Sequence, residues 1–227
     1  INAVKIFNEK EVDELIVLDI DATSNGSEPD YKMIENLAAE CRMPLCYGGG
    51  IKNLSQASKI FSLGVEKIAM SSLLLKDMDE VEEIIKRVGK QSVVAVLDIK
   101  KKTFGNKYEI YTHNGTKATG VEPVFFSKKL EEVGVGEIVI NSIDQDGMMK
   151  GYDMKLIENI RDTISIPLTV LGGAGSLDDI GEVIKEHGII GVAAGSLFVF
   201  KGKFKAVLIN YPTPDEKEAL MEKYFKK

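Results

Sequence analysis

The feature that most constrains the fold of this chain is an internal repeat. The segment PLCYGGGIKNLSQASKIFSLGVEKIAMSSLL, which starts at Pro44, aligns with PLTVLGGAGSLDDIGEVIKEHGIIGVAAGSLF, which starts at Pro167. The offset between the copies is 123 residues at these prolines and 124 residues between Ser72 and Ser196. Each copy contains an apolar run, a glycine turn and a helical pattern in the same order. We therefore expect two structurally similar halves.

Short β-branched runs alternate with amphipathic segments along the chain. The runs expected to form strands are 15–20, 44–47, 67–70, 92–98, 137–143, 167–171 and 189–194. Most are continuously apolar, which is typical of parallel strands covered on both faces. Helical patterns lie at 29–41, 53–63, 76–88, 122–133, 153–164, 176–187 and 214–226, and another helix ends before Lys10. This alternation predicts βαβ units and a parallel sheet.

Two halves of four βα units each would form an eight-stranded (βα)8 barrel, or TIM barrel. The strand that ends at Asp98 opens the second half, and its counterpart would lie 123 residues earlier, before Ile1. We therefore expect an α/β TIM barrel whose first strand and following loop are missing from this sequence. The alternative is an open doubly wound sheet, but no dinucleotide-binding glycine motif follows the first visible strand.

No Pro- or Ser-rich linker divides the chain, so we expect a single domain over residues 1–227. Its half-barrels are predicted at about 1–90 and 91–227. The polar segment 101–120, which contains KYEIYTHNGTKATG, interrupts the alternation and is predicted to be an inserted β-hairpin.

Composition excludes several classes of function. A net charge of −6 and the absence of tryptophan argue against a nucleic-acid surface, because Lys and Arg hold the phosphate backbone. No apolar run reaches the roughly 18–20 residues of a membrane helix. Two cysteines, Cys41 and Cys46, make no disulfide framework and no zinc spacing, so we expect two reduced thiols. With no signal-peptide pattern, a cytoplasmic location is expected.

In such barrels the active site lies at the C-terminal ends of the strands. Two clusters of glycine and serine, related by the repeat, fall there: Gly48–Gly50 with Ser71 and Ser72, and Gly172–Gly173 with Gly195 and Ser196. Glycines let backbone N–H groups approach an anion, and hydroxyls add hydrogen bonds. The pair of clusters predicts a substrate with a phosphate at each end, the alternative being that the glycines serve only tight turns.

Asp98 ends an apolar strand, SVVAVLD, and is a candidate general acid or base. The alternative is a carboxylate paired with Lys100. Asp144 and Asp146 in SIDQDG could bind ribose hydroxyls or bind nothing, but capping of the next helix is favoured for one of them. With no histidine or soft-ligand cluster at the strand ends, we expect no metal site. His113 in the hairpin is more often a solvated histidine than a substrate contact.

Seven motifs, taken in order, cover essentially the whole chain: LIVLDIDAT, YGGGI, VVAVLDIKK, THNGTKATG, INSIDQDGMMKGYD, GGAG and AAGSLF. Together they resemble the cyclase subunit of imidazole glycerol phosphate synthase, the HisF family of histidine biosynthesis. The resemblance implies a lyase without a cofactor, paired as a heterodimer with a glutaminase subunit that delivers ammonia through the barrel. The implied substrate is a bisphosphorylated formimino-ribulosyl aminoimidazole carboxamide ribonucleotide. The implied products are imidazole glycerol phosphate and an aminoimidazole carboxamide ribonucleotide.

The resemblance also implies roles for individual residues. Asp98 matches the catalytic general acid. Substrate-binding residues, including both phosphate sites, are matched by Asp19, Gly50, Ser71, Ser72, Lys100, Asp146, Gly147, Gly173, Gly195 and Ser196. Charged residues of the opposite face, where the family gates ammonia and docks its glutaminase, are matched by Glu14, Lys67 and Glu137. The alternative for these three is a surface salt bridge, which contributes little to stability.

The chain also departs from the family pattern. The family's second catalytic aspartate lies on the first strand, outside this sequence. Ser71 stands where the family usually has asparagine, Asn141 where it has threonine, and Leu171 where it has serine. The ending FVFKGKFKAVLINYP resembles a divergent branch linked to surface-polysaccharide sugars. The alternative function is therefore an ammonia-channelling subunit of a sugar amidotransferase.

Overall fold

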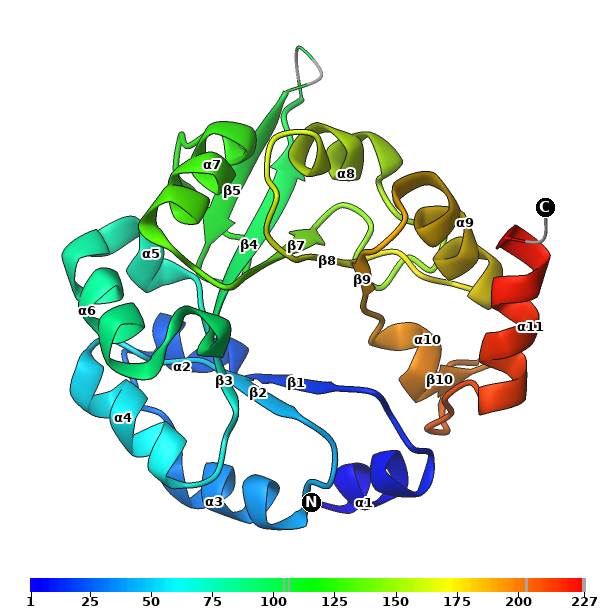
Figure 1. The fold of residues 1–227 in the computed structure, drawn as a ribbon, viewed down its shortest axis with the longest axis horizontal. Helices are drawn as coiled ribbons and strands as arrows, with labels where there is room; N and C mark the ends of the chain where they lie inside the picture. The colour runs from blue at the N-terminus through cyan, green and yellow to red at the C-terminus, as the bar shows by residue number, and fades with distance from the viewer. Residues whose placement is uncertain (104, 106, 203, 226–227) are drawn as a thin grey trace.

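The computed structural model describes residues 1–103, 105, 107–202 and 204–225. Its main sheet runs in the order β1-β2-β3-β4-β7-β8-β9, and every neighbouring pair along this path is parallel. The strands are β1 (Leu15–Leu18), β2 (Leu45–Gly48), β3 (Lys67–Met70), β4 (Val93–Lys101), β7 (Glu137–Ser142), β8 (Leu168–Leu171) and β9 (Gly191–Val192). Figure 1 shows the sheet curling, with β1 and β9 as its two edges.

Helices form a ring around the outside of the strands (Figure 1). The longer ones are α1 (Asn2–Glu9), α3 (Tyr31–Glu40), α4 (Leu54–Ser62), α6 (Met78–Val88), α7 (Pro123–Val133), α8 (Met154–Arg161), α9 (Leu177–His187) and α11 (Pro214–Phe225). Side-chain caps explain where several begin: Asn53, Asp77, Asp153 and Ser176 each accept a backbone N–H of the first turn. Helix α7 ends at Gly134, whose φ of 96° is readily adopted only by glycine.

Three short helices follow strand ends and were not predicted: α2 (Ile20–Ser24), α5 (Ser72–Lys76) and α10 (Ser196–Val199). A single 3-10 turn, η1 (Lys90–Ser92), precedes β4. Each of the three short helices has only four or five residues. Such helices are too short to show the apolar periodicity that predicts a helix from sequence. They shorten the predicted strand 15–20, which ends at Leu18 because Asp19 caps α2.

The predicted hairpin is an extension of a barrel strand. Strand β4 continues to Lys101 and pairs antiparallel with β5 (Tyr108–Thr112), which pairs with β6 (Lys117–Ala118). Residues 104 and 106 of the predicted insertion, and residue 226 of the predicted last helix, lie outside the described residues. A second small hairpin joins β10 (Phe200–Lys201) to β11 (Ala206–Val207).

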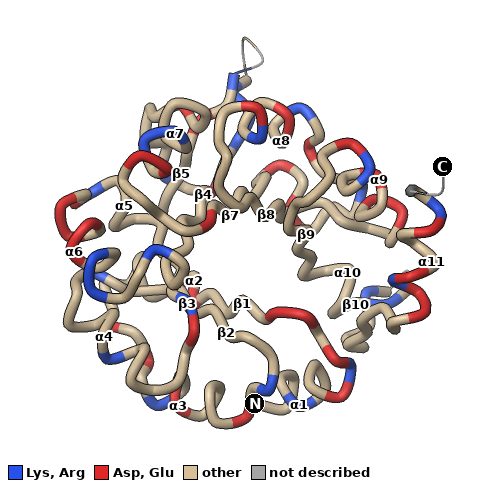
Figure 2. The backbone as a smooth tube through the Cα atoms, in the orientation of Figure 1, with Lys and Arg blue, Asp and Glu red and all other residues tan. Residues whose placement is uncertain are grey.

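The apolar core has two layers. The larger layer packs the helices against the outside of the sheet, with Ile34, Ile60, Ile84, Leu130 and Ile160 completely buried. The smaller layer fills the inside of the curl with Cys46, Ala69, Val94, Val96 and Val139, packed against Ile16 and Leu171. Most charged residues lie on the outer helices and loops (Figure 2). The alternation of strand residues between the two layers follows the period of two of a strand.

The predicted parallel α/β barrel sheet is confirmed, with seven strands in the described part of the chain. The single-domain organisation, its division into half-barrels and the location of a first strand before Ile1 stay predictions. Cys41 and Cys46 are both free thiols. No helix among the described residues is long and apolar enough to cross a membrane.

Candidate functional site

A cavity of about 210 Å³ opens at the C-terminal ends of the strands. Its lining comes from the loops after β1, β2, β3, β5 and β7 and from the ends of β4 and β8. The predicted site residues that line it are Asp19, Gly50, Ser71, Ser72, Asp98 and Asp146. The fold therefore brings these six residues to one cavity.

The first glycine–serine cluster forms one wall of this cavity. Gly50 has a φ of 70°, which glycine adopts without strain, and an added Cβ would lie 3.0 Å from the Ser27 carbonyl oxygen. Ser71 precedes α5, but its hydroxyl makes no capping hydrogen bond. Among the described residues the N–H groups of Gly49 and Gly50 donate to no acceptor. This wall offers N–H and O–H donors of the kind that hold a phosphate.

The second cluster surrounds a much smaller cavity of about 10 Å³, shared by the predicted site residues Asp146, Gly147, Gly173, Gly195 and Ser196. The structure thus brings this set together as well. The enclosed space at this cluster is much smaller than at the first. Gly173 has a φ of 122°, and a Cβ there would overlap the Gly151 carbonyl. The tight packing of that loop explains the small volume.

Asp98 lies toward the C-terminal end of β4, where it pairs with Tyr111 of β5 and Asn141 of β7, and it lines the cavity. Burial raises the pKa of its carboxyl, a hydrogen bond from Asn141 Nδ2 at 2.9 Å lowers it, and the charge of Asp146 raises it again. The net shift is upward. A carboxyl group with a raised pKa holds its proton closer to neutral pH, which suits a general acid or base.

The ion pair between Asp98 and Lys100, the alternative considered for Asp98 from the sequence, is not observed among the described residues. Lys100 Nζ instead lies 5.8 Å from the centroid of the Tyr111 ring. Lys100 is absent from the cavity lining, so the structure does not bring this predicted site residue to the others. Asp19 does line the cavity, but its Oδ1 accepts the N–H groups of Asp21 and Ala22 as the cap of α2.

The prediction that Asp144 or Asp146 caps the next helix was wrong. Asp153 caps α8 by accepting the N–H of Leu156 at 3.1 Å. Asp144 instead accepts the backbone N–H of Lys101 at 2.9 Å, which ties the loop after β7 to the end of β4. Asp146 therefore remains available at the junction of the two cavities.

The cavity also contains polar residues that are not among the predicted site residues. Asn141 and Thr112 line it, and His113, with a φ of 52°, lies there with Nδ1 3.0 Å from Thr112 Oγ1. Asn114 Nδ2 donates to Asp21 Oδ1 at 3.3 Å across the mouth. These residues come from β5, the β5–β6 turn and β7. The sequence signals for them were the motif THNG and, for Asn141, the motif INSIDQDG, where asparagine stands in place of the family's threonine.

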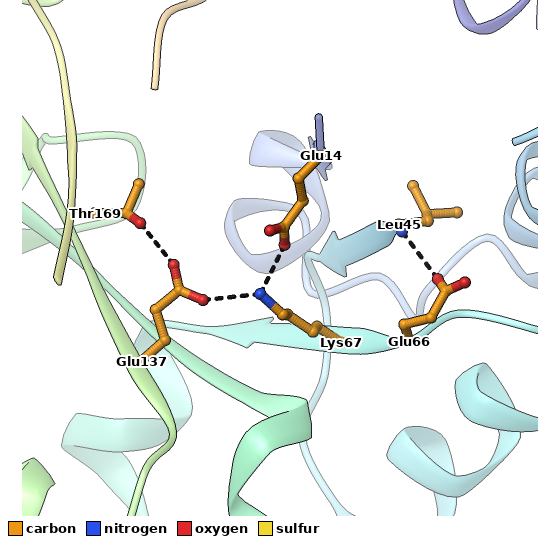
Figure 3. Close-up of polar contacts among 6 residues, drawn as sticks. All are labelled: Glu14, Leu45, Glu66, Lys67, Glu137 and Thr169. Atoms are coloured by element: carbon orange, nitrogen blue, oxygen red, sulfur yellow. Dashed lines mark hydrogen bonds and ion pairs between the residues drawn. The ribbon is translucent and has the colours of Figure 1, made fainter. Parts of the chain in front are cut away.

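A second constellation lies at the opposite, N-terminal ends of the strands (Figure 3). Lys67 Nζ is 2.8 Å from Glu14 Oε1 and 3.0 Å from Glu137 Oε2, and Thr169 Oγ1 donates to Glu137 Oε1 at 2.6 Å. Burial alone would lower the pKa of Lys67, but the hydrogen bonds to Glu14 and Glu137 outweigh it and the pKa is raised. We call these four residues the basal ring. The structure brings all three predicted partner-face residues together in it.

Between the basal ring and Asp98 lies the smaller apolar layer of Cys46, Ala69, Val94, Val96 and Val139. A further cavity of about 500 Å³ runs beside it between β1 and β9. Its lining reaches from Glu14 and Thr169 at the basal ring to Leu171 and Gly195 at the other end. No group of three His, Cys, Asp or Glu side chains within the described ranges is arranged to hold a metal ion.

Comparison with known proteins adds family information. The family described as "Histidine biosynthesis protein" matches residues 1–205. A relative from Vibrio vulnificus (strain YJ016) is 54% identical over 222 residues, covering 98% of this chain and 85% of the relative. One from Leptospira interrogans is 56% identical over 220 residues, covering 97% and 87%. One from Pseudomonas aeruginosa is 50% identical over 212 residues, covering 93% and 84%.

The names of these three relatives, each assigned provisionally, are imidazole glycerol phosphate synthase subunit hisF3, HisF and hisF2. The family match spans most of the chain, and the identities are at or above one half. Both agree with the curled parallel sheet and with the motifs at its C-terminal edge. The chain therefore belongs to the histidine biosynthesis protein family, and within it to the HisF family of these relatives.

Proposed function

We propose that this chain is the cyclase subunit of an imidazole glycerol phosphate synthase. It uses ammonia supplied by a glutaminase partner to convert the bisphosphorylated formimino-ribulosyl aminoimidazole carboxamide ribonucleotide. The products are imidazole glycerol phosphate and the aminoimidazole carboxamide ribonucleotide, so the reaction is a lyase and cyclase step of histidine biosynthesis.

The observation that carries this proposal is the position of Asp98. Its carboxyl lies in the cavity at the C-terminal edge, with Ser71 and Ser72 on one wall and Asp146 at the junction with the second cluster. A substrate held by a phosphate at each cluster would place its central atoms over Asp98. The raised pKa of this carboxyl allows it to give a proton to the substrate and take one back.

The basal ring and the apolar layer support the ammonia route and the glutaminase partner. Neutral ammonia crosses an apolar layer far more readily than ammonium does, because burying an unpaired charge is very unfavourable. The residues of this layer are small or β-branched. In this proposal Glu14, Lys67 and Glu137 line the entrance, and the face around them meets the glutaminase to form a heterodimer.

The decisive experiment measures steady-state turnover of the formimino-ribulosyl ribonucleotide at saturating ammonium and high pH, with the full-length encoded protein and no glutaminase. Asp98→Asn is expected to lower turnover by about 10²–10⁴-fold, the range of general acid–base contributions, while affinity for a phosphate ligand changes little. Asp162→Asn, at the exposed end of α8, is the matched control and should keep full activity. Comparable turnover in Asp98→Asn would remove Asp98 from the mechanism.

A second candidate function is an ammonia-channelling subunit of a sugar amidotransferase. The observation that favours it is Leu171, which lines both cavities at the C-terminal edge with an apolar side chain. This function needs the basal ring and the barrel interior but not Asp98. It predicts that the folded full-length protein activates a glutaminase yet gives no cyclase turnover, even with abundant ammonium.

A further inference from the structure

Asn141 lies at the C-terminal end of β7 with two different neighbours. In the parallel ladder it pairs with Asp98 of β4 on one side and with Leu171 of β8 on the other. Its Nδ2 donates to Asp98 Oδ1 at 2.9 Å. Leu171 offers no polar group, so the amide has a hydrogen-bond partner on the β4 side only.

The other end of the same amide is unsatisfied. Asn141 Oδ1 is buried and has no hydrogen-bond partner among the described residues. An unpaired buried acceptor is unfavourable, so a side chain selected for stability alone would turn this oxygen toward a donor or be apolar. Turning the amide over would place Oδ1 against the Asp98 carboxylate, where the two oxygens repel. Asp98 therefore determines how Asn141 is oriented.

We propose that Asn141 is a positioning residue for Asp98, holding carboxyl Oδ1 so that Oδ2 carries the proton that is exchanged with the substrate. In the proton transfer the Oδ2–H bond breaks, the proton binds the substrate atom above it, and the electron pair stays on the carboxylate. The hydrogen bond from Asn141 strengthens as that negative charge develops. This inference rests on the proposed function, because it assigns a role within the same reaction.

The surroundings of Asp98 indicate what removal of this amide would do. Tyr111 of β5 pairs with Asp98 in the antiparallel ladder, and Lys100 follows on β4 itself. The other titratable groups around the cavity are Asp146 after β7, Asp19 after β1 and His113 after β5. Of the three causes that shift the pKa of Asp98, only the hydrogen bond from Asn141 lowers it. Replacing Asn141 by an apolar residue should therefore raise this pKa further.

The test titrates the Asp98 carboxyl by carbon-13 NMR in protein labelled at aspartate, with the resonance assigned by its loss in Asp98→Asn. The midpoint is expected to move upward in Asn141→Leu. Ser142→Ala, on the same strand, is the matched control and should leave the midpoint unchanged. If Asn141→Leu fails to fold, Asn141→Ala replaces it. An unmoved midpoint in the folded variant would overturn the inference.

Kinetics then separate this inference from the proposed function. In Asn141→Leu, kcat with ammonium should fall about tenfold, with KM changed less than about twofold, and the limb of the pH profile set by Asp98 should move upward. An unchanged limb beside a shifted NMR midpoint would refute the positioning role of Asn141 in the reaction. A wild-type protein without turnover would refute the proposed function instead, whatever the NMR titration gives.

Discussion

Replacing Lys67 by methionine tests whether the basal ring is more than a surface salt bridge. The Lys67 and Glu137 side chains are only 24% and 16% exposed, whereas Glu14 is 36% exposed. The change leaves two carboxylates near each other without their shared cation. Glu137 keeps one hydrogen bond, from Thr169. The loss of stability should therefore exceed that of an exposed pair and stay below that of a fully buried one.

The magnitude follows from these exposures. Exposed ion pairs contribute about 0.2–1 kcal/mol, and breaking a buried pair costs about 3–5 kcal/mol. For Lys67→Met we expect a loss of about 2 kcal/mol in the free energy of unfolding, because the pair with Glu137 lies between these limits. Glu14→Gln should cost only about 0.5 kcal/mol, since the Lys67–Glu137 pair survives it.

The assay is urea denaturation followed by circular dichroism, because the chain has no tryptophan to report by fluorescence. Lys86→Met is the matched control: Lys86 also has two glutamate partners, Glu82 and Glu83, but its side chain is 65% exposed. It should lose far less stability than Lys67→Met. Equal losses in the two lysine variants, or an equal loss in Glu14→Gln and Lys67→Met, would refute the reasoning.

The difference in stability between the wild type and Lys67→Met should depend on pH. The pKa of Lys67 is raised in the folded state, so the folded protein binds that proton more tightly than the unfolded chain. The stability contributed by Lys67 is then fully present below its unfolded pKa of about 10.4 and is lost as pH rises through the folded pKa. The wild type and Lys67→Met should therefore converge only in strongly alkaline solution.

Three further outcomes are expected. Asp98→Asn should be more stable than the wild type at pH 7, because the raised pKa makes the ionised carboxylate unfavourable in the fold; the gain should vanish below about pH 4 in urea titrations. Gly173→Ala should weaken binding of inorganic phosphate in calorimetry, because its Cβ overlaps the Gly151 carbonyl; Gly188→Ala, with a φ of 69° and open space, is the control. Tyr152→Phe should lower the free energy of unfolding by about 1–2 kcal/mol, because it removes the part-buried hydrogen bond from Tyr152 Oη to the Ala193 carbonyl oxygen.

The strands and long helices could be predicted because their signals are local. The apolar composition of a run such as SVVAVLD predicts a strand by itself. Asn53 and Ser176 each predict a helix start, because their side chains accept the N–H of the residue three positions later. The basal ring and the two glycine clusters were reached through the repeat and the family resemblance. Those signals place residues at strand ends, and the barrel fold brings the ends of its strands together independently of which side chains they carry.

The contacts that tune the site could not be predicted in this way, because they depend on register between strands distant in sequence. Asn141 meets Asp98, 43 positions away, only because β7 pairs with β4 after the chain has passed through β5 and β6. A shift of one residue would turn the amide to the helix-covered face of the sheet. The same dependence explains why Asp144 bonds the backbone of Lys101 rather than capping a helix.

The repeat predicts two similar glycine–serine clusters, but the structure shows that the cavities at the two clusters differ in size. Both halves place glycines and a serine at corresponding strand ends, yet one cluster opens on a cavity of about 210 Å³ and the other on about 10 Å³. In both halves the loop after the preceding strand brings a backbone carbonyl to the corresponding glycine, but the approach is closer in the second half. An added Cβ on Gly173 would overlap the Gly151 carbonyl, whereas one on Gly50 would lie 3.0 Å from the Ser27 carbonyl oxygen. The second cluster therefore presents less enclosed space to a ligand than the first. Because a Cβ at residue 173 would overlap the Gly151 carbonyl, Gly173→Ala should weaken phosphate binding at this second cluster and leave the Ser71 and Ser72 side unchanged.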